Sequence, residues 1–518
     1  MTALERAIRH PEPVLGFADR SPVDGLDRRS VGFADVLAQS VSAVAPAAAA
    51  TTIPLLIASA GGSPVWALAS GMLIALLVAS TVNQFTKRIA ATGSLYTFVS
   101  RGLGRTASFV TGVALLVGYG FISMFALAGA GYYLQILLGD LWPASASTPL
   151  SAGVLIAVMA VVCAVVLARG IRVSTRVTLL VESVSVVIIL VLVGALLYRN
   201  GPTVNWSVLS LAGTTPTTFA VGAALALTAF VGFESASTLG VEARRPFANI
   251  PRAIFRTVIV AGLLYLVASF SQVVGFAALG RGLSTSTSPV NDLAAAYGIG
   301  GLGLLLDVSI AASFLACAIA SITALVRVLF SMGREGLLPS ALGRTHDRYR
   351  TPFVAVVISV PVLTLSVVVT IALTGSVWRA MEILIVGAAG GYITAYTLAC
   401  IAAPVFLHRI GELTVWSALR AAAAAVLLSV VLVVYLVSES TTDRYAGVWV
   451  FLAVMTVGIV FYLVRHLRRP WLRHAVGIYD VPVGADVLGA VNGFGTMNGH
   501  TVGETDAVRR GGKAAAGS

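Results

Sequence analysis

Two carboxylates inside long apolar stretches are the residues of this chain most able to do chemistry. Glu182 lies in LLVESVSV and Glu234 lies in FVGFESAS. An ionisable group inside a bilayer is costly, so such residues are candidates for contact with a substrate, an ion or a proton. Glu182 is a candidate for proton coupling, because a buried carboxylate can take up and release a proton. The alternative is a structural ion pair with Arg176 or Arg172, which is the commoner role of such a residue.

Two of the apolar stretches contain residues that interrupt a helix. In SAVAPA, Pro46 lacks a backbone N–H group and disfavours helical geometry at Ala45. In FVGFESAS, a glycine, an acid and serines weaken the helix that lipid would otherwise enforce. Irregular backbone survives at membrane depth only where protein buries it or water reaches it, so both breaks predict a polar site. The predicted substrate-binding residues are Ser42, Ala43, Val44, Ala45, Pro46, Ala47, Phe230, Gly232, Phe233, Glu234 and Ser235.

Aromatic residues near the two breaks are candidates for gates over such a site. They are Tyr119, Phe233 and Tyr392, although plain packing is the commoner role of a single aromatic side chain. Two roles are open for Glu234. Its carboxylate could cap unpaired amides of the break, or it could face a cationic substrate.

Twelve apolar segments are long enough to hold these residues inside a membrane, since a span needs roughly 20 residues. All but four of the 34 Lys and Arg residues fall in alternate loops and in the two ends of the chain. Cytoplasmic loops collect Lys and Arg, so this distribution predicts a cytoplasmic location for both termini. The predicted spans are 33–60, 64–85, 107–138, 150–168, 176–199, 217–241, 253–279, 304–330, 352–374, 380–407, 417–437 and 446–467.

The two interrupted segments each head a set of five spans. Five is an odd number, so the second set must be inserted upside down relative to the first. Paired interrupted helices at corresponding positions of inverted halves are typical of the binding site of a secondary transporter. Two unrelated kinks are the simpler alternative, but the agreement of position and topology favours transport geometry.

Composition argues against several other classes of protein. Hydrophobic residues make up 58% of the chain and charged residues 11%, whereas about a quarter are charged in soluble domains. The net charge of +12 comes from the loops, which suits anionic lipid headgroups better than nucleic acid. The three cysteines lie far apart, and the spans hold no cluster of His, Cys and acids that would suit a membrane enzyme. We therefore expect no enzymatic activity, no cofactor or metal, and no nucleic-acid partner.

Three motifs resemble those of the amino acid–polyamine–organocation permeases. Residues 229–246 (AFVGFESASTLGVEARRP) with NIPRAI at 249–254 resemble the signature of that family's sixth helix. The stretch ATGSLYTF at 91–98 with RGLG at 101–104 resembles its loop after the second helix, and RVLFSMGREGLLP at 327–339 its eighth-helix exit. The resemblance implies an all-α membrane protein of the leucine-transporter type. That fold has two inverted repeats of five helices, with helices 1 and 6 discontinuous, plus two peripheral helices.

The resemblance also implies site residues, and here the chain departs from the family pattern. Mapped onto this sequence, Ser42–Ala47 and Phe230–Ser235 would meet the substrate. Many amino acid permeases have a glycine-rich first break, whereas this chain has Ala-Val-Ala-Pro-Ala, which leaves an amine or polyamine substrate open. Some proton-coupled relatives place a Lys in the fifth helix where this chain has Glu182. Helix eight offers Ser309 and Ser313 but no adjacent Ser-Thr pair for sodium, which favours proton coupling or exchange.

The sequence therefore predicts a multi-pass transporter of the cell membrane. It would move amino acids or related organic amines by alternating access, with protons as the coupling ion. The alternatives are an amine or polyamine permease or exchanger, and a non-transporting nutrient sensor on the same fold. We expect a cytoplasmic tail at 1–32, a transporter core at 33–407, peripheral helices at 408–470 and a disordered cytoplasmic tail at 471–518.

Overall fold

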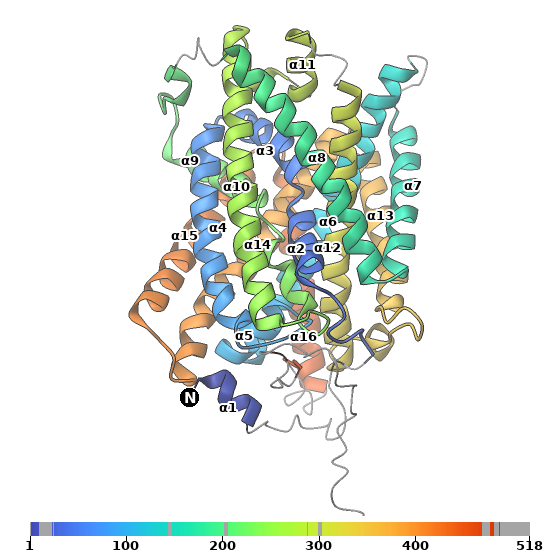
Figure 1. The fold of residues 1–518 in the computed structure, drawn as a ribbon, viewed down its shortest axis with the longest axis vertical. Helices are drawn as coiled ribbons and strands as arrows, with labels where there is room; N and C mark the ends of the chain where they lie inside the picture. The colour runs from blue at the N-terminus through green and yellow to red at the C-terminus, as the bar shows by residue number, and fades with distance from the viewer. Residues whose placement is uncertain are drawn as a thin grey trace, which may run out of the picture.

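The computed structural model is a bundle of long helices (Figure 1). It describes residues 2–9, 23, 25–142, 148–200, 206–286, 288–298, 303–468, 477–480 and 486. Within these residues, twelve segments are long and apolar enough to cross a membrane, which confirms the predicted spans. The β structure of the same residues consists of two isolated bridges, Val31 with Ala243 and Ala90 with Asp480.

The spans follow one another along the chain, and the longest connection joins the seventh span to the eighth. The α-helices are α1 (Ala3–Arg9), α2 (Phe33–Val44), α3 (Pro46–Ser59), α4 (Pro64–Thr86), α5 (Leu95–Leu103), α6 (Arg105–Leu141), α7 (Pro149–Ala168), α8 (Ile171–Asn200), α9 (Pro216–Thr228), α10 (Pro246–Ala278), α11 (Pro289–Ala296), α12 (Gly303–Arg334), α13 (Phe353–Thr374), α14 (Val377–Arg409), α15 (Val415–Glu439) and α16 (Tyr445–Arg468). Short 3-10 helices are η2 (Trp206–Leu209), η3 (Phe233–Leu239), η4 (Leu283–Thr285) and η6 (Ser340–Gly343).

The first span is broken where the sequence predicts. Helix α2 ends at Val44, Ala45 adopts a left-handed conformation with φ 45°, and α3 begins at Pro46. Proline suits the first position of a helix, because its fixed φ is already helical and that N–H group would have no helical partner. Pro54 lies inside α3 without ending it. The break therefore depends on the left-handed residue before Pro46 as well as on the proline.

The sixth span is broken in a different way. Helix α9 ends at Thr228, an irregular turn follows, and the chain resumes as η3 from Phe233. Gly232 has φ 97°, a conformation that only glycine adopts at no cost. A Cβ atom at this position would lie 2.7 Å from the Cβ of Ala43, so glycine also lets the two breaks approach each other.

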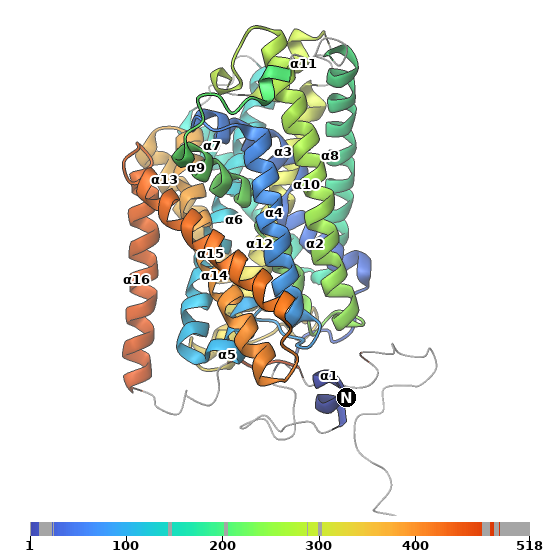
Figure 2. The ribbon, with the colours of Figure 1, turned by 90° about the vertical axis from the view of Figure 1, so that its left-hand side faces the viewer.

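Helix α6 runs through the middle of the bundle and packs mainly against α14 and α12 (Figure 1). Small residues allow the closest of these approaches. A Cβ atom on Gly391 of α14 would lie 2.5 Å from the backbone nitrogen of Gly118 on α6. The outer helices α15 and α16 flank this core on one side (Figure 2).

One end of the bundle holds α1, α5 and the loops with most of the Lys and Arg residues, and we call it the basic end. Residues 25–31 pack here, where Val31 pairs with Ala243. The predicted disorder of 471–518 lies mostly outside the described residues. Of that stretch, residues 477–480 and 486 are described, and Ile478, Asp480 and Asp486 are buried at the basic end.

Candidate functional site

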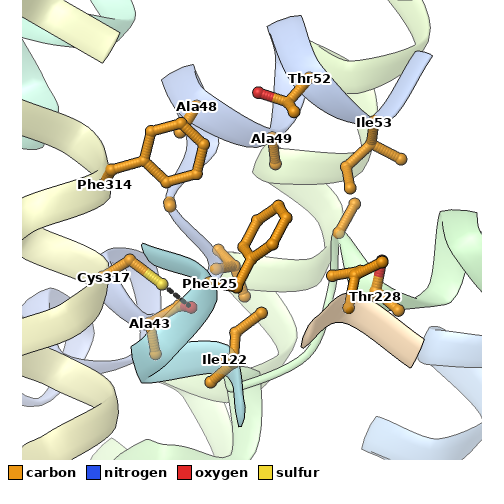
Figure 3. Close-up of a pocket in the computed structure, with 14 residues that line it drawn as sticks. Ala43, Ala48, Ala49, Thr52, Ile53, Ile122, Phe125, Thr228, Phe314 and Cys317 are labelled. Carbon is orange, nitrogen blue, oxygen red and sulfur yellow. Dashed lines mark hydrogen bonds between the residues drawn. The ribbon is translucent and has the colours of Figure 1, made fainter. Parts of the chain in front are cut away.

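A small cavity lies between the two broken spans near the middle of the bundle (Figure 3). Its volume is about 20 Å³, which is room for about one water molecule. The side chains around it are apolar or hydroxylic, and none is charged. They belong to Ala43, Val44, Ala45, Ala48, Ala49, Thr52, Ile53, Ile122, Phe125, Thr228, Ala229, Phe314, Cys317 and Ile385.

Hydrogen bonds hold the two breaks side by side. The Tyr265 hydroxyl of α10 lies 3.0 Å from the carbonyl oxygen of Val44 and 2.9 Å from that of Ala229. The Ser40 hydroxyl donates to the carbonyl of Phe233 over 2.6 Å. The carbonyls of Val44 and Ala229 lie at the ends of α2 and α9, where the broken helices leave them without a helical partner. The geometry of the cavity is therefore fixed by polar contacts as well as by packing.

The backbone around the cavity presents charge of both signs. The first turn of α3 provides the positive end of a helix dipole, and the N–H group of Ala47 in that turn has no acceptor within the helix. The last turns of α2 and α9 end at Val44 and Thr228 and provide negative ends. This arrangement suits a zwitterion, whose carboxylate would face α3 and whose ammonium group would face the carbonyls.

Glu182 is buried on α8 behind the first break, with an exposed fraction of 1%. Both of its carboxylate oxygens lie 3.0 Å from the Ser313 hydroxyl of α12. The same hydroxyl accepts a hydrogen bond from the N–H group of Ala48 over 3.2 Å. An ion pair between Glu182 and Arg176 or Arg172 is not formed, and Arg172 lies 3.7 Å from Asp27 instead. The carboxylate is thus connected to the first turn of α3 through one hydroxyl.

Glu234 joins the sixth-span break to α6 and α14. Its carboxylate accepts hydrogen bonds from the hydroxyls of Tyr119, over 2.7 Å, and Tyr396. The Gly232 N–H group donates to the Tyr396 hydroxyl over 3.4 Å. The Phe233 ring stacks on Tyr396, with 5.4 Å between ring centroids. The Glu234 side chain therefore holds the break against α6 and α14, and it does not line the cavity.

The structure brings only part of the predicted set to the cavity. Ala43, Val44 and Ala45 line it, whereas the other eight predicted binding residues lie beside or behind it. The gate candidates Tyr119 and Tyr392 pack edge to face, 5.3 Å between centroids, outside the lining. Sequence reasoning missed the lining residues of α3, α6, α9, α12 and α14. The available signal was weak: on α6 and α12 they are apolar pairs three residues apart, Ile122 with Phe125 and Phe314 with Cys317.

A buried ion pair closes the basic end below the site. The Arg327 guanidinium of α12 lies 2.8 Å from a carboxylate oxygen of Glu242, which follows η3. Burial raises the pKa of Glu242, and the nearby Arg327 charge opposes that rise. Arg29 contacts Asp480 at 2.9 Å and Asp486 at 2.7 Å, so the two ends of the chain meet beneath this pair.

Glu335 holds residues 477 and 478 against the same end. One carboxylate oxygen accepts the backbone N–H groups of Gly477, over 2.8 Å, and Ile478, over 2.9 Å. The other oxygen accepts the Tyr96 hydroxyl. Burial raises the pKa of Glu335 to about 7, although all three hydrogen bonds favour the charged carboxylate.

Comparisons with known proteins identify the family and the fold of this chain. A family model described as "Amino acid permease" matches residues 35–474. The branched-chain amino acid permease BcaP of Bacillus subtilis (strain 168) is 26% identical over 298 residues, which are 55% of this chain and 62% of that protein. The low-affinity putrescine importer PlaP of Escherichia coli (strain K12) is 25% identical over 304 residues, 56% of this chain and 64% of the importer.

A methylthioribose transporter of Bacillus subtilis (strain 168) is 25% identical over 294 residues, 54% of this chain and 62% of that protein. The matched region thus spans less than two thirds of the length of these curated relatives. Among solved structures, MhsT in complex with L-phenylalanine superposes with a TM-score of 0.59 at 15% identity. The match covers 79% of this chain and 99% of MhsT. The chain therefore shares the leucine-transporter-type fold, which confirms the two inverted sets of five spans.

Proposed function

Because the chain belongs to the amino acid permease family, we propose that it is a secondary transporter that moves a small neutral, apolar amino acid by alternating access. The single observation that supports this substrate best is the cavity between the two breaks. Backbone groups of opposite polarity meet there, and the side chains around them are apolar. A zwitterion with an apolar side chain satisfies both features.

A diamine is the competing substrate, because a putrescine importer is among the relatives. A diamine has two ammonium groups, and each needs an acceptor in the low-dielectric interior. The cavity lining includes no carboxylate, and both nearby acids are engaged: Glu234 with two tyrosines and Glu182 with Ser313. The chemistry of the lining therefore favours the amino acid.

Movement is a necessary part of the proposal. A cavity of about 20 Å³ cannot hold an amino acid, so binding requires the rings of Phe125 and Phe314 to move apart (Figure 3). Release at the basic end requires the Glu242–Arg327 pair and the contacts of residues 477–480 to separate. The two rings line the cavity itself, whereas the Glu242–Arg327 pair lies at the basic end, so the two barriers can open separately, as alternating access demands.

We further propose that Glu182 is the proton-coupling residue. A charged carboxylate must accept the hydrogen of the Ser313 hydroxyl, and a protonated one can donate to Ser313 instead. When the Ser313 hydroxyl changes from donor to acceptor toward Glu182, its hydrogen bond with the Ala48 N–H group changes as well. The protonation state of Glu182 therefore affects the first turn of α3. Transport driven by ATP hydrolysis within this chain would need a nucleotide-binding motif, and the sequence contains no P-loop.

The test is uptake by the purified protein in sealed liposomes with an imposed proton gradient. We expect leucine, valine or a similar amino acid to accumulate, and a protonophore to abolish accumulation. Putrescine should fail to compete at concentrations where these amino acids do. Preferential competition by putrescine would refute the substrate assignment, and binding without accumulation would instead indicate a sensor.

Glu182→Gln tests the coupling assignment in the same liposomes. Glutamine keeps the size and a hydrogen bond with Ser313 but cannot titrate. We expect exchange of labelled for unlabelled substrate to persist, while proton-driven accumulation falls about tenfold or more. Accumulation that persists in this variant, or that requires sodium, would contradict proton coupling through Glu182.

A further inference from the structure

A second cavity, of about 340 Å³, lies at the basic end between the ends of α4, α10 and α15. The two helices α4 and α10 pack along their length, and α15 crosses α4 beside them (Figure 2). Three of the side chains around the cavity are cations: Lys87 at the end of α4, Arg252 on α10 and Arg420 on α15. Of the remaining lining residues, Ser80, Asn83 and Gln84 are polar, Pro251 and Phe255 are apolar, and none is acidic.

The protein does not neutralise these three charges among its described residues. Neighbouring Arg88 pairs with Glu412 over 2.6 Å, whereas Lys87, Arg252 and Arg420 take part in none of the ion pairs of the described chain. Arg420 donates from Nε to the carbonyl of Trp416, which occupies one of its five N–H donors. Three cations around one cavity repel one another, so an anion bound there would be stabilised by all three.

The floor of the cavity is already hydrogen-bonded within the protein. The Asn83 side chain donates to the carbonyl of Pro251 over 3.1 Å and so ties α4 to α10. The Gln84 side chain donates to Ser80 and accepts from Arg88. The cations are therefore the groups left to bind a ligand, and guanidinium groups match the geometry of phosphate oxygens.

The surroundings of the cavity indicate which phosphate would bind. Farther from the basic end, α10 exposes Val260 and Leu263, and α15 exposes Val426 and Leu427, which places hydrocarbon surface above the charges. Trp416 is 75% exposed on α15, one turn before Arg420. Exposed tryptophans of this kind anchor helices at the membrane interface. A ligand with an anionic head and apolar chains fits both parts of this surface. Basic pockets between membrane helices on the cytoplasmic side recognise such lipids.

We propose that this cavity binds the headgroup phosphate of an anionic phospholipid. Lys87, Arg252 and Arg420 hold the phosphate, and the acyl chains lie along the exposed faces of α10 and α15. The bound lipid connects α15 to α4 and α10, which the protein itself ties together through the hydrogen bond from Asn83 to Pro251. This site is separate from the central cavity and does not depend on which substrate is transported.

Native mass spectrometry of the delipidated full-length protein with added phosphatidylglycerol or phosphatidylcholine tests the proposal. We expect phosphatidylglycerol to bind preferentially and to raise the temperature of unfolding. The double variant Arg252→Gln/Arg420→Gln should bind it about tenfold more weakly. Arg105→Gln/Arg348→Gln removes two exposed cations at the same end but outside the cavity, and it should bind within about twofold of the parent. If the first double variant fails to fold, Lys87→Gln serves in its place, with a smaller loss in the same direction.

Three outcomes would overturn the proposal. Equal binding of phosphatidylcholine would show that the cavity does not recognise the anionic head. An equal loss in the Arg105/Arg348 control would show a diffuse effect of net charge. Stabilisation by inorganic phosphate equal to that by phosphatidylglycerol would identify a site for a soluble anion rather than for lipid.

Discussion

The hydroxyl of Ser313 is the smallest group on which the proposed coupling depends. It donates to Glu182 and accepts from the Ala48 N–H group, so it joins α8, α12 and α3 through a single oxygen atom. Its removal leaves a buried carboxylate and a buried amide without this partner. Each unsatisfied group of this kind costs about 1–3 kcal/mol.

Ser313→Ala should therefore lower both the stability of the protein and its proton-driven uptake. Ser309→Ala is the matched control, because Ser309 lies one turn away on α12 and its buried hydroxyl has no hydrogen-bond partner. We expect the control to unfold within about 0.5 kcal/mol of the parent and to transport normally. Thermal unfolding in detergent and uptake in liposomes measure the two effects. Equal behaviour of the two variants would argue against the proposed role of Ser313.

Glu335 predicts a pH dependence of stability at the basic end. Its pKa is raised to about 7 in the folded protein, above the value near 4.3 of an unperturbed glutamate. The folded state therefore binds more protons than the unfolded state between these values, and this contribution to stability falls as pH rises from about 4.5 to 7. Glu335→Gln removes the titration and keeps an acceptor for the N–H groups of Gly477 and Ile478.

The measurement is the unfolding temperature of both proteins between pH 5 and pH 8. We expect the advantage of the parent over the Gln variant to shrink between pH 5 and about pH 7 and to level off above that. Because other groups titrate in both proteins alike, the difference between them isolates Glu335. A difference that grows with pH would mean that the carboxylate is stabilised in its charged form.

At the scale of elements, the two breaks have different causes. In the first span, a left-handed Ala45 precedes a helix that begins at Pro46, whereas Pro54 is accommodated inside α3. In the sixth span, the irregular turn ends at Gly232, where a side chain would collide with Ala43. The first break therefore depends on the missing donor of Pro46 together with the left-handed Ala45, and the second on the missing side chain of Gly232.

Pro46→Ala should weaken the first break, because alanine restores an N–H donor and removes the restriction on Ala45. We expect reduced uptake and slower hydrogen exchange of the amides at 45–48 as α2 and α3 become more continuous. Pro54→Ala is the control within the same span, and its uptake should stay close to that of the parent. Loss of uptake in the control alone would show that Pro54, rather than the break, is needed.

At the scale of the whole molecule, Glu242 and Arg327 join the end of the sixth span to α12 and close the basic end. Both side chains are buried, with exposed fractions of 1% and 3%. Breaking a buried ion pair by removing one partner costs about 3–5 kcal/mol, because the other charge is left unpaired. Replacing both partners with neutral residues costs far less.

Arg327→Gln alone should therefore destabilise the protein strongly, while Glu242→Gln/Arg327→Gln should recover most of the loss. The recovered variant also lacks the charge attraction that closes the basic end. We expect the added substitution Ile478→Cys to react faster with a soluble maleimide in the Glu242→Gln/Arg327→Gln variant than in the otherwise unchanged protein. A double variant as unstable as the single one would mean that the pair contributes by shape rather than by charge.

The sequence by itself determined the spans, their alternating orientation and the two breaks, because these follow from local properties. Twenty apolar residues must cross a bilayer, a proline cannot donate, and a glycine alone reaches certain backbone angles. It also identified Glu182 and Glu234 as unusual, since a carboxylate in an apolar stretch stands out without any knowledge of its neighbours.

Only the tertiary structure decided which side chains face the cavity and what the two acids contact. Ile122, Phe125, Phe314 and Ile385 resemble the many other apolar residues of their helices, and their exposure to the cavity depends on how α6, α12 and α14 are rotated and crossed. The partners of Glu182 and Glu234 come from residues more than a hundred positions away. Contacts between distant helices leave no local pattern in the sequence, so these partners can be identified only from the packing of the helices.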